Sequence, residues 1–147
     1  MGSLPPLLRP MVVPLIAGLV CWLLGRRATW ASRVIALLTA ALAFGLCAKI
    51  WSLGVDTWSP LEPWMRLGTV DLQIALKVTS FSGFLALAAT VFTFLIVLYS
   101  FGYGGTIANL GKYYAYVLWT MAGAIGAFYA NDLIFLLFCW EVLTLLL

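Results

Sequence analysis

The chain has 147 residues, of which 65% are hydrophobic and 9% are charged, and its formal net charge is +3. Soluble domains carry about 25% charged residues, so the composition excludes an ordinary water-soluble fold. The few basic residues are scattered or lie between apolar segments, and we therefore expect no nucleic-acid partner. The apolar segments are about 18 residues long, close to the roughly 20 residues that cross a bilayer. The sequence predicts an all-α integral membrane protein with about five transmembrane helices.

The first two helices are expected at about residues 7–24 and 34–51. No small-residue cleavage site follows the first apolar stretch, and basic residues come next, so we interpret it as a retained span and not as a signal peptide. The loop between the two helices carries three arginines, Arg26, Arg27 and Arg33. By the positive-inside rule this loop faces the cytoplasm, which places the N-terminus outside.

Residues 52–79 form the largest polar segment, and part of it alternates with a period of two. Apolar side chains alternate with mostly polar ones from Val70 to Val78, which is typical of a β-strand. Gly68 and Thr69 could turn this strand back on residues 64–67 as a hairpin. The sequence therefore predicts a short extracytoplasmic β-hairpin or strand between the second and third helices.

The third and fourth helices are expected at about residues 81–99 and 113–130, joined by a glycine-rich loop on the cytoplasmic side. The fourth helix carries small residues at four-residue intervals, namely Ala122, Gly126 and Ala130. Small residues in such a stripe let another helix approach closely. We expect this stripe to serve packing and not chemistry.

A fifth helix is predicted from Asn131, as N-cap, to Leu147, with Asp132 in its first turn, where a carboxylate suits the helix dipole. Sixteen residues give only about 24 Å of helix, which is short of the hydrocarbon thickness. We therefore expect the fifth helix to be incomplete. Either the chain is a piece of a longer protein, or another chain completes the structure.

Most charged and aromatic side chains have an ordinary structural explanation. Lys112 is a loop charge, and Lys49 can extend its ammonium to the interface. Asp132 is a helix-start residue. Trp119 and Trp140 lie within helices and are expected to contribute to packing, whereas most other tryptophans and tyrosines lie near helix ends, as in an interfacial aromatic belt.

Glu141 is the candidate proton-transfer residue. It follows the predicted helix start by nine residues, about 13.5 Å, which places it near the bilayer centre. A carboxylate at that depth costs several kcal/mol unless it meets a partner charge, water or other polar groups. The alternative is a neutral, protonated Glu141 that is hydrogen-bonded to a neighbouring helix. No cationic partner at the same depth is evident on the other four helices.

The sequence contains no histidine, and its three cysteines, Cys21, Cys47 and Cys139, all lie in apolar segments. We expect them to be small buried hydrophobic residues. No metal ligands, haem ligands or nucleotide fingerprint are evident, so we predict no catalytic, cofactor-binding or metal-binding residue in this chain. Electron transfer would then belong to other subunits.

Three stretches carry a resemblance to a known family: LYSFGY at 98–103, GKYYAY at 111–116 and NDLIFLLFCWEVLTLL at 131–146. They resemble the N-terminal part of the antiporter-like membrane subunits shared by respiratory complex I, Mrp-type cation/proton antiporters and energy-converting membrane-bound hydrogenases. The resemblance implies a longer fold with two inverted helical repeats. Residues 1–79 would be the leading helices and external strand segment, and residues 80–147 the third helix and the start of the first repeat.

The resemblance also implies a role for Glu141, which aligns with a glutamate that pairs with a lysine two helices later and takes part in proton transfer. That lysine would lie outside this chain. One departure is local: the family commonly has Asp-Gly-Leu-Ser at the entry to the third helix, where this chain has residues 79–82, Thr-Ser-Phe-Ser. Any role of that aspartate is therefore not carried over.

The expected function is that of a proton- or cation-translocating membrane subunit, or an N-terminal portion of one, in a complex I-like redox-driven ion pump. It would not be catalytic alone. The expected partners are the lipid bilayer and other membrane subunits, including a segment with an intramembrane lysine, in a bacterial or archaeal cytoplasmic membrane. The alternatives are a purely structural membrane subunit with a neutral Glu141 and a small secondary transporter that dimerises.

Overall fold

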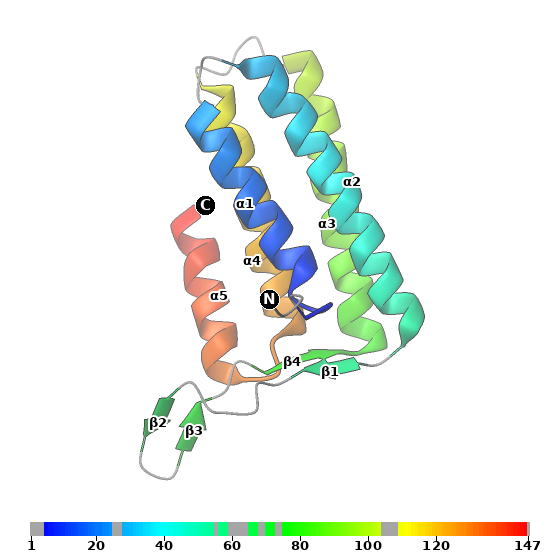
Figure 1. Ribbon diagram of the computed structural model, residues 1–147, viewed down its shortest axis with the longest axis vertical. Coiled ribbons are helices and arrows are strands. Elements are labelled where there is room, and N and C mark those ends of the chain that lie inside the picture. The colour runs from blue at the N-terminus through cyan, green and yellow to red at the C-terminus, as the bar shows by residue number, and fades with distance from the viewer. Residues whose placement is uncertain are drawn as a thin grey trace.

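The computed structural model describes residues 5–24, 28–54, 56–58, 65–67, 70–72, 75–103 and 109–146, with backbone alone for the three short segments at 56–72 and for Tyr103. These residues form five α-helices (Figure 1). Their bounds are α1 Arg9–Leu24, α2 Thr29–Leu53, α3 Ser80–Tyr103, α4 Leu110–Tyr129 and α5 Leu133–Leu146. Helices α1 to α4 form an elongated bundle, and the shorter α5 lies at its edge (Figure 1).

Two helices, α2 and α3 as far as Gly102, are long and apolar enough to cross a membrane. Helices α1 and α5 are shorter and also apolar. This architecture is compatible with the predicted all-α membrane protein, although α5 has only 14 residues.

Helix α2 begins at Thr29, earlier than the sequence pattern predicted. The Ala28 carbonyl accepts hydrogen bonds from the backbone N–H of Ser32, at 3.0 Å, and from its hydroxyl, at 3.2 Å. These bonds form the first helical turn, although polar residues there interrupt the hydrophobic pattern. The prediction that Arg33 belongs to a loop is therefore wrong, because Arg33 lies inside α2.

Four short strands lie at the end of the bundle where α2 ends and α3 begins (Figure 1). They are β1 Asp56–Trp58, β2 Met65–Leu67, β3 Val70–Leu72 and β4 Leu76–Val78. Strand β2 pairs with β3, and β1 pairs with β4, both antiparallel. The alternating segment at 70–78 thus contributes to two separate pairings and not to a single strand. Gly68 and Thr69, the predicted turn, lie outside the described residues.

Strand β4 closes one end of the bundle. Leu76 and Val78 are each only 1% exposed, whereas Lys77 between them is exposed. The period of two in the sequence therefore separates a buried face from an open face in this strand. Thr79 and Ser82 then cap α3, because the Ser82 N–H donates to the Thr79 hydroxyl and the Thr79 N–H donates to the Ser82 hydroxyl, at 3.1 and 2.8 Å.

The most extensive helix contact joins α1 to α4, and it depends on small residues. A Cβ atom at Gly18 would lie 2.6 Å from Trp119 Cδ1 and 3.2 Å from the Ala115 carbonyl oxygen. The Trp119 indole N–H donates a hydrogen bond of 3.1 Å to the Leu15 carbonyl. Trp119 therefore packs against α1 as predicted, and its one polar group is satisfied by a carbonyl of that helix.

Helix α4 also packs closely against α5. A Cβ atom at Gly126 would lie 2.8 Å from Met11 Cε of α1 and 2.9 Å from Cys139 Sγ of α5. Ala122 is buried as well, but Ala130 lies past the helix end and forms an isolated bridge with Leu76. The predicted packing stripe thus ends at Gly126.

Candidate functional site

Helix α5 begins with a well-defined cap. The Asp132 carboxylate accepts a hydrogen bond of 2.7 Å from the N–H of Ile134. Asp132 immediately precedes Leu133 and therefore acts as the N-cap, a role that the sequence pattern had suggested for Asn131. The Asn131 N–H instead donates to the Ala75 carbonyl at 2.9 Å, next to β4. The start of α5 is thus fixed to the strand end of the bundle.

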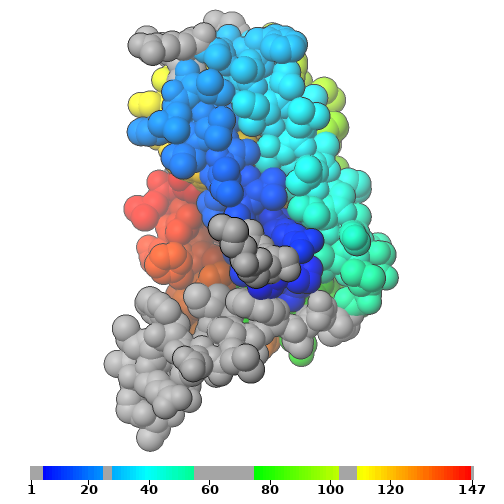
Figure 2. All heavy atoms as spheres, in the orientation of Figure 1, coloured from blue at the N-terminus to red at the C-terminus, as the bar shows by residue number. Residues whose placement is uncertain are grey.

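Most of α5 is not covered by the described residues. The space-filling view shows α5 at the edge of the molecule (Figure 2), and its most extensive contact is with α4. Of the described α5 residues, Cys139 alone is buried. Trp140, expected to pack, is 64% exposed. The other exposed large apolar residues of α5 are Leu133, Ile134, Leu137, Phe138 and Leu145.

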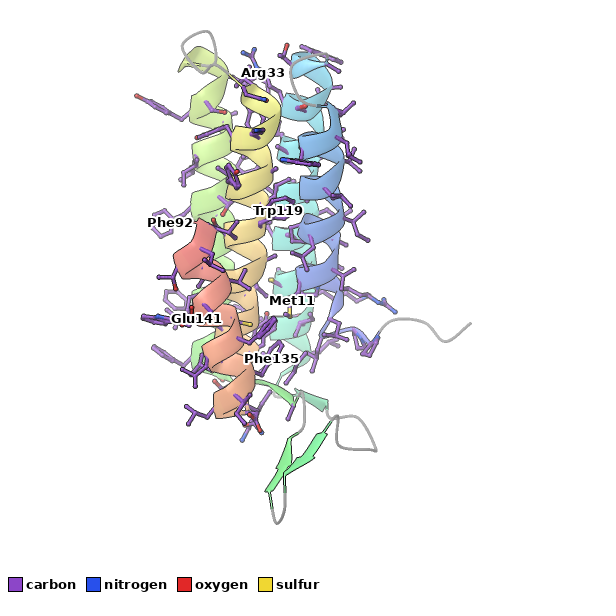
Figure 3. The ribbon with its side chains drawn as sticks, turned by 90° about the vertical axis from the view of Figure 1, so that its left-hand side faces the viewer. Met11, Arg33, Phe92, Trp119, Phe135 and Glu141 are labelled. Carbon is purple, nitrogen blue, oxygen red and sulfur yellow. The ribbon has the colours of Figure 1, made fainter. Side chains whose placement is uncertain are left out.

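Glu141 lies within this exposed apolar surface. At 100° per residue, the exposed residues of α5 span an arc of about 160°, and Glu141 lies near its middle. The side chain is exposed and lies on a different side of α5 from Phe135, which points towards Met11 of α1 (Figure 3). Eight residues separate Glu141 from Leu133, which places it about 12 Å from the helix start.

The described part of the chain provides no charged or hydrogen-bonding partner for Glu141. Its three lysines, Lys49, Lys77 and Lys112, are exposed near the ends of other elements, in α2, β4 and α4. The candidate site is therefore a carboxylate on an uncovered apolar helix face. Any partner for Glu141 would come from residues outside the described part or from another chain.

A surface groove of about 420 Å³ lies next to the last turn of α5, between α3 and α4. Leu146 lines it together with apolar residues of the other two helices. It also contains four hydroxyl-bearing residues, Thr93, Tyr113, Tyr116 and Thr120. A helix or lipid seated there would find both apolar contacts and hydrogen-bonding groups.

One buried polar pair was missed by the sequence reasoning. The Ser100 and Tyr114 hydroxyls share a hydrogen bond of 2.7 Å, and both residues are buried between α3 and α4. The Ser100 hydroxyl also donates to the Val97 carbonyl at 2.6 Å. Both residues belong to the stretches that carried the family resemblance, which could have drawn attention to them. Neither a serine nor a tyrosine alone indicates that the two would pair.

The cysteines are buried, as expected: Cys21, Cys47 and Cys139 are all free thiols in the helix interior. The Cys21 thiol donates to the Ser32 carbonyl at 3.7 Å. Within the described ranges, no group of three or more histidine, cysteine or acidic side chains is arranged to hold a metal ion.

Comparison with known proteins finds sequence relatives, whereas no protein-family model matches. The chain is 28% identical over 149 residues to NADH-quinone oxidoreductase subunit M of Escherichia coli strain K12. It is 29% identical over 146 residues to the subunit of that name from Pseudomonas aeruginosa. Each alignment covers 90% of this chain and 28% of the relative, so the chain spans less than a third of the length of these proteins.

The fold is also found in a solved structure, that of the membrane-bound sulfane sulfur reductase, an archaeal respiratory membrane complex. The TM-score is 0.76 at 23% sequence identity, and the match covers 97% of this chain and 22% of that chain. At this identity the match establishes the fold. Sequence and fold together confirm that this chain is related to the antiporter-like membrane subunits of complex I-like respiratory complexes.

Proposed function

We propose that the chain is part of a proton- or cation-translocating membrane subunit in a complex I-like redox-driven pump, and that Glu141 transfers protons in it. The observation that supports this proposal is the position of Glu141, exposed in the middle of the uncovered apolar face of α5. Helix capping explains Asp132, the other acid near this helix, but no contact in the described structure explains Glu141.

The energetic argument concerns what must cover this face. Burying an ionised carboxylate without a partner costs several kcal/mol, and intramembrane acids therefore pair with charges or line hydrated paths. A helix that packs on α5 must bring a cation, water or a hydrogen-bonding group to Glu141. A lysine supplied by another membrane segment meets this need, and its charge would change the proton affinity of Glu141.

The orientation that we propose places the N-terminus and residues 52–79 outside and the loop at 103–112 inside. Its support is the placement of cations. Arg33 near the start of α2 and Lys112 in the first turn of α4 lie at the end of the bundle opposite the strands. Helices α1 to α4 contain no acidic residue that would offset them. The support comes from the short segment at 25–33, which carries three arginines and faces the cytoplasm by the positive-inside rule, whereas Arg9, Lys49, Arg66 and Lys77 are spread over separate elements at the strand end.

The test is Glu141→Gln in the parent complex, reconstituted into liposomes. Glutamine preserves size and hydrogen bonding but cannot titrate, so ion pumping should fall sharply while subunit content is retained. Redox turnover is measured in the same preparation. The matched control is Asp132→Asn, the second acid at this helix, because asparagine remains a good N-cap. This control should pump as the wild type does.

Two outcomes would contradict the proposal. Wild-type pumping by Glu141→Gln excludes a proton-transfer role and favours the alternative of a structural subunit, in which Glu141 is a neutral hydrogen-bonding group. In that case Glu141→Leu should reduce assembly. Equal losses of pumping in Glu141→Gln and Asp132→Asn would show a general sensitivity of α5 and not titration at one carboxylate.

A further inference from the structure

Arg33 presents a hydrogen-bonding group that the described residues leave unsatisfied. Its guanidinium carbon lies 5.8 Å from the centroid of the Phe101 ring, so the cation of α2 rests over an aromatic ring of α3. Its Nε is buried and has no hydrogen-bond partner in the described structure. Because arginine remains charged, a buried donor of this kind calls for an acceptor.

No acidic residue of the neighbouring helices can supply this acceptor. The five acids of the sequence are Asp56, Glu62, Asp71, Asp132 and Glu141, and none falls in α1 to α4 or in the connections at 25–28 and 104–109. Arg33 lies at the end of the bundle opposite the strands (Figure 3). No acidic side chain of these segments can therefore neutralise Arg33, and an anion that does so would come from outside them.

The depth of Arg33 corresponds to the headgroup region. It lies four residues after the start of α2, about 6 Å along the helix axis. Trp30, almost one turn earlier, is 73% exposed, as befits an interfacial aromatic anchor. A phosphate at the level of Arg33 would be at the membrane surface, where phospholipid phosphates lie.

An apolar groove lies closer to the middle of the bundle than Arg33, between the same two helices. It has a volume of about 240 Å³ and is lined by Ala41 and Phe44 of α2 and by Val91 and Phe94 of α3. Phe44 follows Arg33 by eleven residues and Phe94 precedes Phe101 by seven, spacings that return to the same helix face. The groove therefore begins about 10 Å deeper than the guanidinium.

We infer that the α2/α3 surface binds one anionic phospholipid, with its phosphate at Arg33 and an acyl chain in the groove of Ala41, Phe44, Val91 and Phe94. Arg33 supplies the charge-assisted hydrogen bonds that select the phosphate. The apolar groove distinguishes a lipid from a free phosphate ion. This inference rests on residues remote from Glu141 and is independent of the proposed ion transport.

The experiment uses the delipidated parent complex that contains the full-length chain. It is titrated with phosphatidylglycerol and, separately, with phosphatidylcholine of the same acyl composition, and bound lipid is counted by native mass spectrometry. Arg33→Gln should weaken phosphatidylglycerol binding about tenfold at one site, as expected for a lost charge-assisted contact. The matched control, Lys112→Gln, removes an exposed cation at the same end and should change binding less than about twofold.

A second variant tests the groove without touching the charge. Ala41→Trp fills the space for the acyl chain, so it should also release the lipid while Arg33 is retained. Inorganic phosphate, added as a competitor, should not displace the lipid, because it makes no contact in the groove.

Any one of the following results would overturn the inference. They are unchanged lipid binding by Arg33→Gln, unchanged binding by Ala41→Trp, equal loss in Lys112→Gln, and displacement of the lipid by inorganic phosphate alone. Equal affinity for the zwitterionic and the anionic lipid would likewise exclude selection of the headgroup charge by Arg33. If Arg33→Gln does not assemble, Ala41→Trp and the comparison of the two lipids still decide the question.

Discussion

Gly126 offers a direct test of how α1, α4 and α5 pack. A Cβ atom there would lie 2.8 Å from Met11 Cε and 2.9 Å from Cys139 Sγ. The Met11 methyl is the end of a flexible side chain and can move away. The Cys139 thiol is held close to the α5 backbone, and α5 is in contact again at Gly123, whose Cβ would lie 3.1 Å from Leu143 Cδ2. Gly126→Ala therefore pushes α5 away from α4.

The expected cost of Gly126→Ala is about 1–3 kcal/mol in the free energy of unfolding, which is the usual range for overpacking in a close-packed interior. Gly45→Ala is the matched control, because a Cβ at Gly45 would meet nothing within 4 Å. That change should not destabilise the protein, because alanine is favoured over glycine in a helix interior by up to about 1 kcal/mol and no clash offsets this gain. Adding Cys139→Ala to Gly126→Ala removes the Sγ atom and should recover part of the loss, a coupling of at least about 0.5 kcal/mol.

These differences are measurable as shifts in the unfolding midpoint of the purified full-length protein in one detergent. Four variants are compared at equal protein concentration: Gly126→Ala, Gly45→Ala, Cys139→Ala and the double variant Gly126→Ala/Cys139→Ala. Gly126→Leu enlarges the same clash and should lower the amount of folded protein further. The reasoning is refuted if Gly126→Ala and Gly45→Ala unfold at the same midpoint. It is also refuted if the effects of Gly126→Ala and Cys139→Ala are simply additive in the double variant.

Three other predictions concern single hydrogen bonds, each read from the same unfolding midpoint. Trp119→Phe removes the indole donor to the Leu15 carbonyl and should cost about 1 kcal/mol beyond the change in volume, whereas an unchanged midpoint would contradict the bond. Asp132→Ala removes the cap of α5 and should cost about 1 kcal/mol, whereas Asp132→Asn should leave the unfolding midpoint nearly unchanged. Equal effects of the two substitutions would exclude capping. Ser100→Ala leaves the buried Tyr114 hydroxyl without its partner, whereas Tyr114→Phe leaves the Ser100 hydroxyl bonded to the Val97 carbonyl. The double variant should therefore lose less than the sum of the single losses, and strict additivity would refute the pairing.

Much of the helical architecture followed from the sequence because membrane helices must satisfy their backbone within each segment. Long apolar runs therefore indicated the helices, within a few residues at each end. The start of α2 was missed because Thr29, Ser32 and Arg33 interrupt the hydrophobic run, whereas the helix is defined by backbone hydrogen bonds from Ala28 onwards. Hydrophobicity locates the part of a helix in hydrocarbon and not the turn that extends into the headgroups.

The tertiary contacts were less predictable. The small residue at Gly126 indicated close packing, but the sequence did not show that Met11 and Cys139 would both meet it. Ala130 was assigned to the same stripe by spacing, yet the helix ends before it and the residue pairs with Leu76. Such contacts depend on how distant segments meet, which periodicity along one helix does not encode.

In the candidate site, too, the residue could be predicted from the sequence, whereas its tertiary surroundings could not. Glu141 was identified because a carboxylate within an apolar run is costly wherever that run lies. The sequence did not indicate that the surrounding face would be open in the described structure, since apolar residues line both the covered and uncovered sides of α5. The groove between α2 and α3 was also not predicted, because its residues come from two helices whose relative rotation the sequence leaves unspecified.

The hydrogen bond between Asn131 and Ala75 has a consequence for the order of folding. It closes a loop that contains the whole of α3 and α4. Closing a long loop has an entropic cost that is not offset until the enclosed helices are packed. The bond therefore forms late, after α3 and α4 have both been inserted and docked. Hydrogen exchange at the Asn131 amide would thus slow only once the helical hairpin is complete.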